Sequence, residues 1–255
     1  MTIAFFRAAF SALFLLLGLS ILRPEWLRIE WRDLPLLISF GLFGVALFFF
    51  VYVSAIDRVG MAVGAVLLYT APAWVTLISW RFLGETIAPR QWLALVLAFA
   101  GCALVAGIYD LHQVRVNGLG ILFGLASGLT YGLYSVFNKA GVRKYPPWTV
   151  LLYGMLVGAL VLLLAQDLSE IARALQSPGA VAWLVALALL PTLGSGLAFA
   201  TGLRFVPVSA ASVVANLEPV IATLLAYLIL GEVMSGWQAL GGVLVIAGAF
   251  ISSQS

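Results

Sequence analysis

Long apolar runs dominate the chain, separated by short segments that carry charges, prolines or glycines. A helix needs about 20 predominantly apolar residues to cross a bilayer. The runs are continuous, whereas the strands of a membrane barrel alternate apolar and polar positions. The pattern therefore predicts nine spanning helices, at residues 3–22, 34–56, 61–83, 91–108, 118–137, 148–165, 180–201, 209–230 and 237–251.

Composition supports a bilayer as the surroundings of the chain. Hydrophobic residues make up 64% of it and charged residues 9%, against about a quarter charged in soluble domains. The 13 Lys and Arg against 10 Asp and Glu form no basic patch, which argues against nucleic acid as a partner. Cys102 is the only cysteine, so no intramolecular disulfide or Cys-based metal framework exists. We expect an all-α, polytopic transmembrane helical bundle in the cell inner (plasma) membrane, with no metal or other cofactor.

Basic residues mark one side of the membrane. Nine of them fall in alternate loops: Arg23, Arg28, Arg32, Arg81, Arg90, Lys139, Arg143, Lys144 and Arg204. The intervening loops hold Arg58, Arg115 and Arg173 beside several acids. Loops rich in Lys and Arg face the cytoplasm. The charge pattern thus predicts an N-terminus outside and a cytoplasmic C-terminus.

The chain repeats itself. The Gly-Glu pair that ends at Glu232 follows the pair that ends at Glu85 by 147 positions, and Pro72 matches Pro219 at the same offset. The first copy, residues 1–110, holds four predicted helices, and the second, 117–253, holds five. A repeat with an odd number of helices reverses its orientation in the membrane. We therefore expect two inverted repeats of a ten-helix design whose first helix is missing, and an apolar helix encoded upstream of Met1.

Three segments resemble the drug/metabolite transporter superfamily, in particular its EamA family. They are LLYTAPAWVTLISWRFLGE (Leu67 to Glu85), ILFGLASGLTYGLYSVFNKAG (Ile121 to Gly141) and SVVANLEPVIATLLAYLILGE (Ser212 to Glu232). The resemblance implies ten helices in two inverted repeats and transport of amino acids, other metabolites or toxic small molecules. It covers essentially the whole chain. The nine visible helices depart from that pattern.

Glu218 is the strongest candidate for a functional ionisable group. It lies near the middle of the run 209–230, where a charge costs about 2.5 to 3.5 kcal/mol on insertion scales. Two interpretations stand: a carboxylate that couples protons or faces substrate, and a structural acid that bonds backbone freed by Pro219. Pro72 and Pro219 each predict a kink, which serves as a hinge or as packing alone.

Other polar residues form stripes on the predicted helices and are candidates for substrate binding. They are Asn216, Tyr69, Tyr131, Tyr134 and Asn138, with Arg7 as a candidate for attracting an anionic group unless it reaches out to the headgroups. Ordinary interhelical hydrogen bonding explains any one of them equally well.

Glycine and glutamate mark predicted packing positions. The four-residue repeat Gly120, Gly124, Gly128 and Gly132 predicts a face for close helix packing. Glu85 and Glu232 are expected to cap a helix end or tie the turn to the next helix. Lys139 marks the cytoplasmic boundary, with a gating role left open.

These features predict a secondary transporter, an exporter or exchanger of small polar metabolites such as amino acids, that works by alternating access. We expect its cavity to be lined by residues 34–56, 61–83, 118–137, 180–201 and 209–230. Two alternatives from other classes are an intramembrane enzyme acting on lipid and a scaffold subunit that transports nothing. No catalytic motif supports an enzyme: Gly194-Ser195-Gly196 lacks the strand of a nucleophile elbow, and the single histidine, His112, lies in a loop. Substrate identity, proton coupling and a homodimer stay open.

Overall fold

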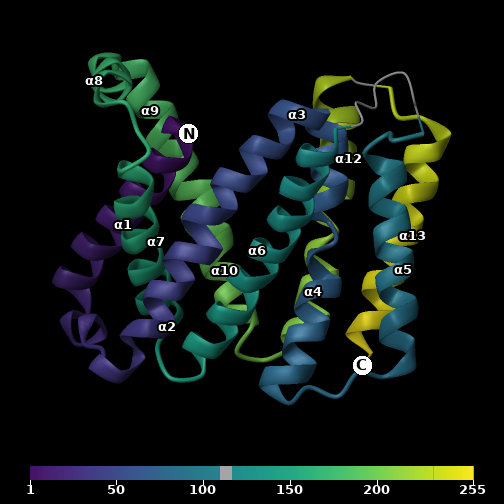
Figure 1. Ribbon diagram of the computed structural model, residues 1–255, viewed down its shortest axis with the longest axis horizontal. Coiled ribbons are helices and arrows are strands. Elements are labelled where there is room, and N and C mark those ends of the chain that lie inside the picture. Colours follow the sequence, from purple (N-terminus) through teal and green to yellow (C-terminus); the bar gives the residue numbers. More distant parts are fainter. Residues whose placement is uncertain (110–116, 232, 255) are drawn as a thin grey trace. The chain divides into compact units, whose positions relative to one another are not determined.

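The structure, a computed structural model, describes residues 1–109, 117–231 and 233–254, and these are helical almost throughout, with no strand among them (Figure 1). Glu232, His112 and Arg115 lie outside the described residues. The elements of the first half are α1 (Thr2–Leu22), η1 (Pro24–Leu27), η2 (Trp31–Asp33), α2 (Leu34–Ser39), η3 (Phe40–Leu47), α3 (Phe48–Leu68), α4 (Ala71–Ile78), η4 (Ser79–Leu83) and α5 (Pro89–Val105). Those of the second half are α6 (Gly118–Val142), α7 (Pro147–Leu163), α8 (Leu168–Gln176), α9 (Pro178–Leu187), η5 (Ala188–Gly194), α10 (Ser195–Gly202), α11 (Val208–Ala215), α12 (Glu218–Leu225), η6 (Ala226–Leu230) and α13 (Gly236–Ser253).

Each predicted apolar run falls on helix, which confirms the all-α membrane fold. Six segments among the described residues are long and apolar enough to span a bilayer, and a seventh is reached if α7 and α8 count as one span. The number is smaller than nine because Trp31–Leu68 is a single 38-residue segment and α5 is a shorter apolar helix. Gly60, with φ of 82°, interrupts the helical backbone within α3 and separates the predicted helices 34–56 and 61–83.

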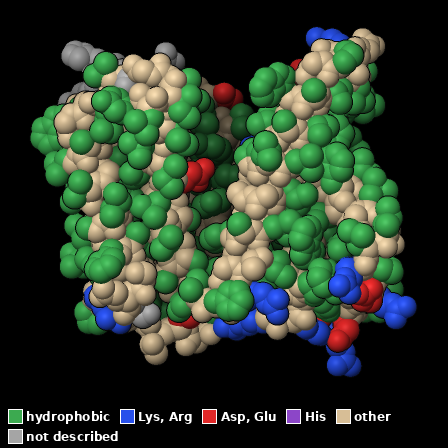
Figure 2. Space-filling model, turned by 180° about the vertical axis from the view of Figure 1, so that it is seen from behind, with side chains coloured by type: hydrophobic (Ala, Val, Ile, Leu, Met, Phe, Trp, Pro, Cys, Tyr) green, Lys and Arg blue, Asp and Glu red, His purple; other side chains and the backbone are tan. Residues whose placement is uncertain are grey.

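The helix surface is apolar, as expected for contact with lipid tails. Large hydrophobic side chains are strongly exposed on several helices, among them Ile21, Leu190 and Val243. Figure 2 shows hydrophobic side chains covering the flanks of the helices, with most Lys and Arg near helix ends. So large an apolar surface is unfavourable in water, whereas it is favourable in the hydrocarbon core of a bilayer.

The helix α8 was not predicted from apolar length. It has nine residues and is bent by 115° from α7. Its N-cap is Asp167, whose carboxylate accepts from the amide N–H of Ser169 at 2.8 Å. Leu168, Ile171 and Leu175 are large apolar residues at helical spacing, and the polar residues of the helix are Ser169, Glu170, Arg173 and Gln176. Such short amphipathic helices lie along a membrane interface.

The contacts divide the chain into two compact units. Unit 1 comprises Met1–Phe50 and Leu133–Phe205, and unit 2 comprises Val51–Gly132 and Val206–Ser255. Each unit takes pieces from both halves of the sequence. The division at residues 110 and 117 rests on the sequence repeat, a different criterion from contacts, and it stays a prediction.

The order of turn, α-helix and π-helix in the first half of the chain recurs 147 positions later in the second half. The turn at Tyr69 and Thr70 corresponds to the turn at Asn216 and Leu217, α4 corresponds to α12, and the π-helix η4 corresponds to η6. Both π-helices end at a left-handed glycine, Gly84 with φ of 72° and Gly231 with φ of 71°. Glycine suits this conformation because it has no Cβ.

In unit 2, α5 and α13 run antiparallel and side by side (Figure 1). The Gln91 side chain at one end accepts from Ser252, and Gln238 at the other end donates to the Val105 carbonyl. Gly101 and Gly241 bring the backbones together: a Cβ on either would lie 2.6 Å from the carbonyl oxygen of the other. This pair forms a closely packed side of the unit.

Candidate functional site in unit 2

The first half of the site is the break between α3 and α4. Pro72 has no N–H for the carbonyl four residues earlier, so the helix opens for one turn at Tyr69 and Thr70. The Thr70 hydroxyl and the Thr70 amide N–H both donate to the Leu67 carbonyl, at 2.6 and 3.2 Å, and so hold the open turn together.

The glycine face of α6 packs directly on this break. A Cβ at Gly128 would meet the Thr70 hydroxyl and lie 2.9 Å from the Leu67 carbonyl oxygen. Gly120 packs against Val59 and Arg58, Gly124 against Leu67, and Gly132 against Trp74. The four glycines therefore form a packing face, as predicted.

The second half of the site is the break between α11 and α12. Here the helix opens at Asn216 and Leu217, and Pro219 removes the next helical donor. The Cys102 thiol of α5 lies 3.7 Å from the Asn216 carbonyl oxygen, which holds the break against α5. The Asn216 side chain is 5% exposed, and its Nδ2 has no hydrogen-bond partner among the described residues.

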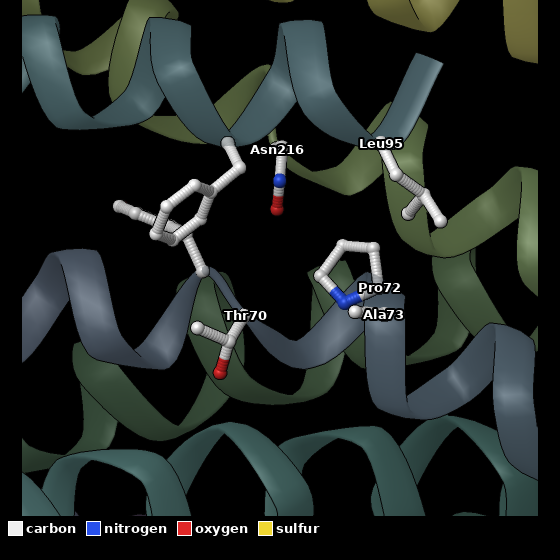
Figure 3. Close-up of a pocket in the computed structure, with 7 residues that line it drawn as sticks. Thr70, Pro72, Ala73, Leu95 and Asn216 are labelled. Atoms are coloured by element: carbon white, nitrogen blue, oxygen red, sulfur yellow. The ribbon is translucent and has the colours of Figure 1, made fainter. Parts of the chain in front are cut away.

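A cavity of about 210 Å³ lies between the two breaks and α5 (Figure 3). The residues that line it are Tyr69, Thr70, Pro72, Ala73, Leu95, Phe99 and Asn216. Figure 3 shows the Asn216 carboxamide pointing into the space, with Leu95 and Pro72 at its side. The sequence had not placed α5 at a cavity, yet α5 supplies Leu95 and Phe99.

Glu218 follows the second break and interacts electrostatically with Tyr69, which also lines the cavity. Glu218 interacts electrostatically with Tyr52 of α3 as well, and Tyr131 interacts electrostatically with Tyr69. Three tyrosines and one carboxylate thus share a region of unit 2. Tyr52 was not predicted from the sequence because it lies outside every polar stripe noted there. It precedes Tyr69 by 17 positions, a spacing that does not place the two residues on one face of a helix.

Glu85 fixes the start of α11. Its carboxylate accepts from the amide N–H of Val208 at 2.8 Å, from the amide N–H of Ser209 at 3.3 Å and from the Ser209 hydroxyl at 2.6 Å. Of the two expected roles, capping a helix end is therefore confirmed, and tying the turn to the next helix along the chain is not. Glu85 caps a helix of the second half of the chain, because the exposed N–H groups at a helix start attract an anion.

Unit 1 holds the remaining predicted site residues, Arg7, Tyr134 and Asn138. Arg7 Nε donates to the Thr192 hydroxyl at 2.8 Å, and the guanidinium carbon lies 5.5 Å from the centre of the Phe49 ring. The Arg7 head group is thus held by protein groups rather than extended to the headgroups.

The end of α6 in unit 1 is also well packed. Tyr134 lies between Phe40 and Phe199, with ring centres 5.1 and 6.4 Å away, and Asn138 is fully buried. Lys139 Nζ donates to the Leu203 carbonyl at 2.6 Å, just after α10 ends. A cation there stabilises the negative end of the helix dipole, so this contact gives Lys139 a structural role.

Comparisons with known proteins indicate a membrane transporter. The profile of the EamA-like transporter family matches residues 1–107 and 118–254. An "Uncharacterized transporter" of Archaeoglobus fulgidus is 31% identical over 83% of this chain and 75% of its own. A "Probable terminal-alkyne amino-acid exporter" of Streptantibioticus cattleyicolor is 26% identical over 86% of this chain and 73% of its own. A solved crystal structure shares the fold with a TM-score of 0.78 at 20% identity, over 99% of this chain and 86% of that one.

Proposed function

This chain belongs to the EamA-like transporter family, and from that membership we propose that it is a secondary transporter that moves small metabolites, amino acids or related compounds, by alternating access. The amino-acid class is suggested by the name of the exporter from Streptantibioticus cattleyicolor. Multi-pass membrane insertion follows from the apolar helices.

One observation carries the proposal: two broken helices meet at one cavity beside an acid. Discontinuous helices with unwound backbone at mid-membrane are typical of the binding sites of secondary transporters. Each break combines a proline with one open turn, so a change in the direction of α4 or α12 needs few altered backbone bonds. In this proposal Pro72 and Pro219 act as hinges, and Tyr69, Tyr131, Asn216 and Glu218 contact or couple to the cargo.

Glu218 is the group we propose for coupling to protons. A carboxylate in a membrane is costly unless it is used or paired, and Glu218 lies exposed within an apolar segment long enough to span the bilayer. Arg7, Tyr134 and Asn138 are proposed as further substrate contacts in unit 1.

The test compares Glu218→Gln with Glu218→Ala in proteoliposomes loaded with amino-acid mixtures and given a pH gradient. If Glu218 carries the coupling proton, the Gln variant loses gradient-driven accumulation by at least about tenfold, while exchange without a gradient persists. Glu25→Gln, a change at an exposed residue of η1, is the matched control and keeps accumulation. Normal accumulation by the Glu218→Gln protein would show that Glu218 is structural.

The same vesicles test the alternative functions. A membrane enzyme would convert a vesicle lipid without moving solute, and a scaffold subunit would do neither while recovering a fixed partner from cells. Family membership favours transport over both.

A further inference from the structure

The cavity beside Asn216 has a chemistry of its own, different from that of Glu218. None of the seven residues that line it carries a charge, and five of them, Pro72, Ala73, Leu95, Phe99 and Tyr69, present mainly carbon. The cavity is partly open at its rim, but a charged group inside would lose part of its hydration without a counterion among the lining residues, which is costly. The cavity therefore favours an uncharged group.

Its size limits what fits. An apolar cavity of about 150 Å³ in a protein admits benzene, and this cavity has about 210 Å³. One aromatic ring with a substituent of a few atoms, or a short branched chain, fills such a volume. A whole peptide or a nucleotide does not.

Asn216 supplies a buried polar group to the cavity. Its carboxamide is nine-tenths buried, points into the cavity and leaves Nδ2 without a partner among the described residues (Figure 3). A buried donor without an acceptor costs about 1 to 3 kcal/mol, so the position is explained best by a ligand that brings the acceptor. Because a carboxamide offers both a donor and an acceptor, another carboxamide or a carbonyl group is its natural complement.

We propose that this cavity binds a small uncharged organic group, about the size of one substituted ring, through a carbonyl or carboxamide that pairs with Asn216. The inference rests on the proposed function, because such a group would be the cargo or the end of the cargo that enters unit 2. It narrows the cargo to molecules with a compact apolar portion.

Benzamide is the probe, since it joins one ring to one carboxamide. Equilibrium dialysis of radiolabelled benzamide against purified protein, at constant detergent, measures binding directly. Wild-type protein is expected to bind benzamide and to bind benzoate at least about tenfold more weakly, because the carboxylate has no counterion in the cavity. Toluene, which lacks the polar group, reports on the apolar part alone.

Three variants separate the contributions. Ala73→Leu fills the cavity and is expected to abolish binding of benzamide and toluene. Ala100→Leu is the matched control on the exposed side of α5 and leaves both unchanged. Asn216→Leu is expected to weaken benzamide at least about fivefold, the equivalent of one buried hydrogen bond, without weakening toluene.

Folding is checked by the melting temperature of each protein without ligand. If Asn216 serves a ligand, the Asn216→Leu protein melts no lower than wild type, because Nδ2 has no protein partner to lose. A clearly lower melting temperature together with unchanged benzamide binding would make Asn216 structural and overturn the proposal.

Two further outcomes would also overturn it. Equal binding by wild type and Ala73→Leu means that benzamide partitions into detergent. Displacement of benzamide by stoichiometric phosphatidylglycerol means that a lipid chain occupies the cavity. The binding assay uses no gradient, so it is independent of the transport assay. If benzamide does not bind, the proposed transport function is not contradicted. If the vesicles show no flux, a positive binding result remains valid.

Discussion

The Glu85 carboxylate accepts three hydrogen bonds at the start of α11, from the Val208 amide, the Ser209 amide and the Ser209 hydroxyl. α11 leads directly into the break at Asn216, so Glu85 fixes the start of the helix that precedes the break. The sequence shows Glu85 only as half of a Gly-Glu pair. It does not show which helix start the carboxylate meets.

Replacing Glu85 with Ala should lower stability by about 1 to 3 kcal/mol, because buried N–H donors lose a charged acceptor. Glu85→Gln should lose about half as much, since one amide oxygen still accepts. Thermal unfolding in detergent measures both. Glu25→Ala is the control, because its ion pair with Arg23 spans 3.7 Å between exposed side chains and contributes little. Equal melting of wild type and Glu85→Ala would refute the capping role.

An ion-pair network in unit 1 ties η2, the charged end of the 38-residue segment Trp31–Leu68, to the connection between α6 and α7. Lys144 Nζ lies 2.6 Å from Asp33 and 2.9 Å from Glu30, and the Tyr145 hydroxyl donates to Asp33. The hydrogen bond from Lys144, followed by that from Tyr145, lowers the pKa of Asp33 below its ordinary 3.8. The bonds to Asp33 and Glu30 raise the pKa of Lys144.

These shifts fix the sign of the pH dependence. Because the folded state prefers ionised Asp33, its contribution is complete above the ordinary pKa and is lost as pH falls through the lowered one. Because it also prefers protonated Lys144, that contribution is complete below the ordinary pKa of 10.5 and is lost at higher pH.

Wild-type protein should therefore melt higher than Asp33→Asn near neutral pH, and the difference should shrink as pH falls from about 5 to about 2. Melting curves of both proteins across that range provide the measurement, with Asp57→Asn, an exposed position, as the control. A difference that stays constant with pH would show that Asp33 acts through packing rather than charge.

At the scale of elements, the breaks in α3/α4 and α11/α12 depend on their neighbours as much as on their prolines. The break at Thr70 fits under α6 because Gly128 has no side chain, and the break at Asn216 is held by Cys102 of α5. A proline in the sequence predicts a kink. The neighbouring helix decides how far the turn opens.

Gly128→Ala tests this dependence. The added Cβ would lie 2.9 Å from a backbone oxygen of Leu67 and would meet the Thr70 hydroxyl, so we expect a loss of about 1 to 3 kcal/mol from overpacking. Gly18→Ala is the matched control, since its Cβ would meet nothing within 4 Å and alanine favours a helix. Thermal unfolding of both variants measures the effect, and equal melting temperatures would mean that α6 can move away from the break.

At the scale of the whole molecule, the orientation in the membrane is a prediction from charge. In a Cys102→Ala background, Gln176→Cys should react with an impermeant maleimide added to intact cells, and Arg143→Cys should react only after the membrane is opened. Both positions are exposed, whereas Gly141 packs against Val150 and would report poorly. The opposite labelling pattern would reverse the proposed topology.

Sequence alone determined the helical membrane class, the nine apolar runs, the kink positions and the glycine packing face. Each of these follows from local chemistry: apolar length, a missing N–H or a missing side chain, which a linear sequence records directly. The repeat was also visible, because the shared backbone turns at Gly84 and Gly231 need the same residue type.

Tertiary structure alone decided which of the marked residues share a site. Tyr131 and Tyr134 belong to one polar stripe of α6, yet the first lies in unit 2 and the second in unit 1. The reach of Glu85 to α11, the place of Tyr52 near Glu218 and the contribution of α5 to the cavity were equally hidden. A periodic pattern shows which residues share a face of one helix, whereas contacts between distant segments depend on how side-chain shapes fit when the helices pack.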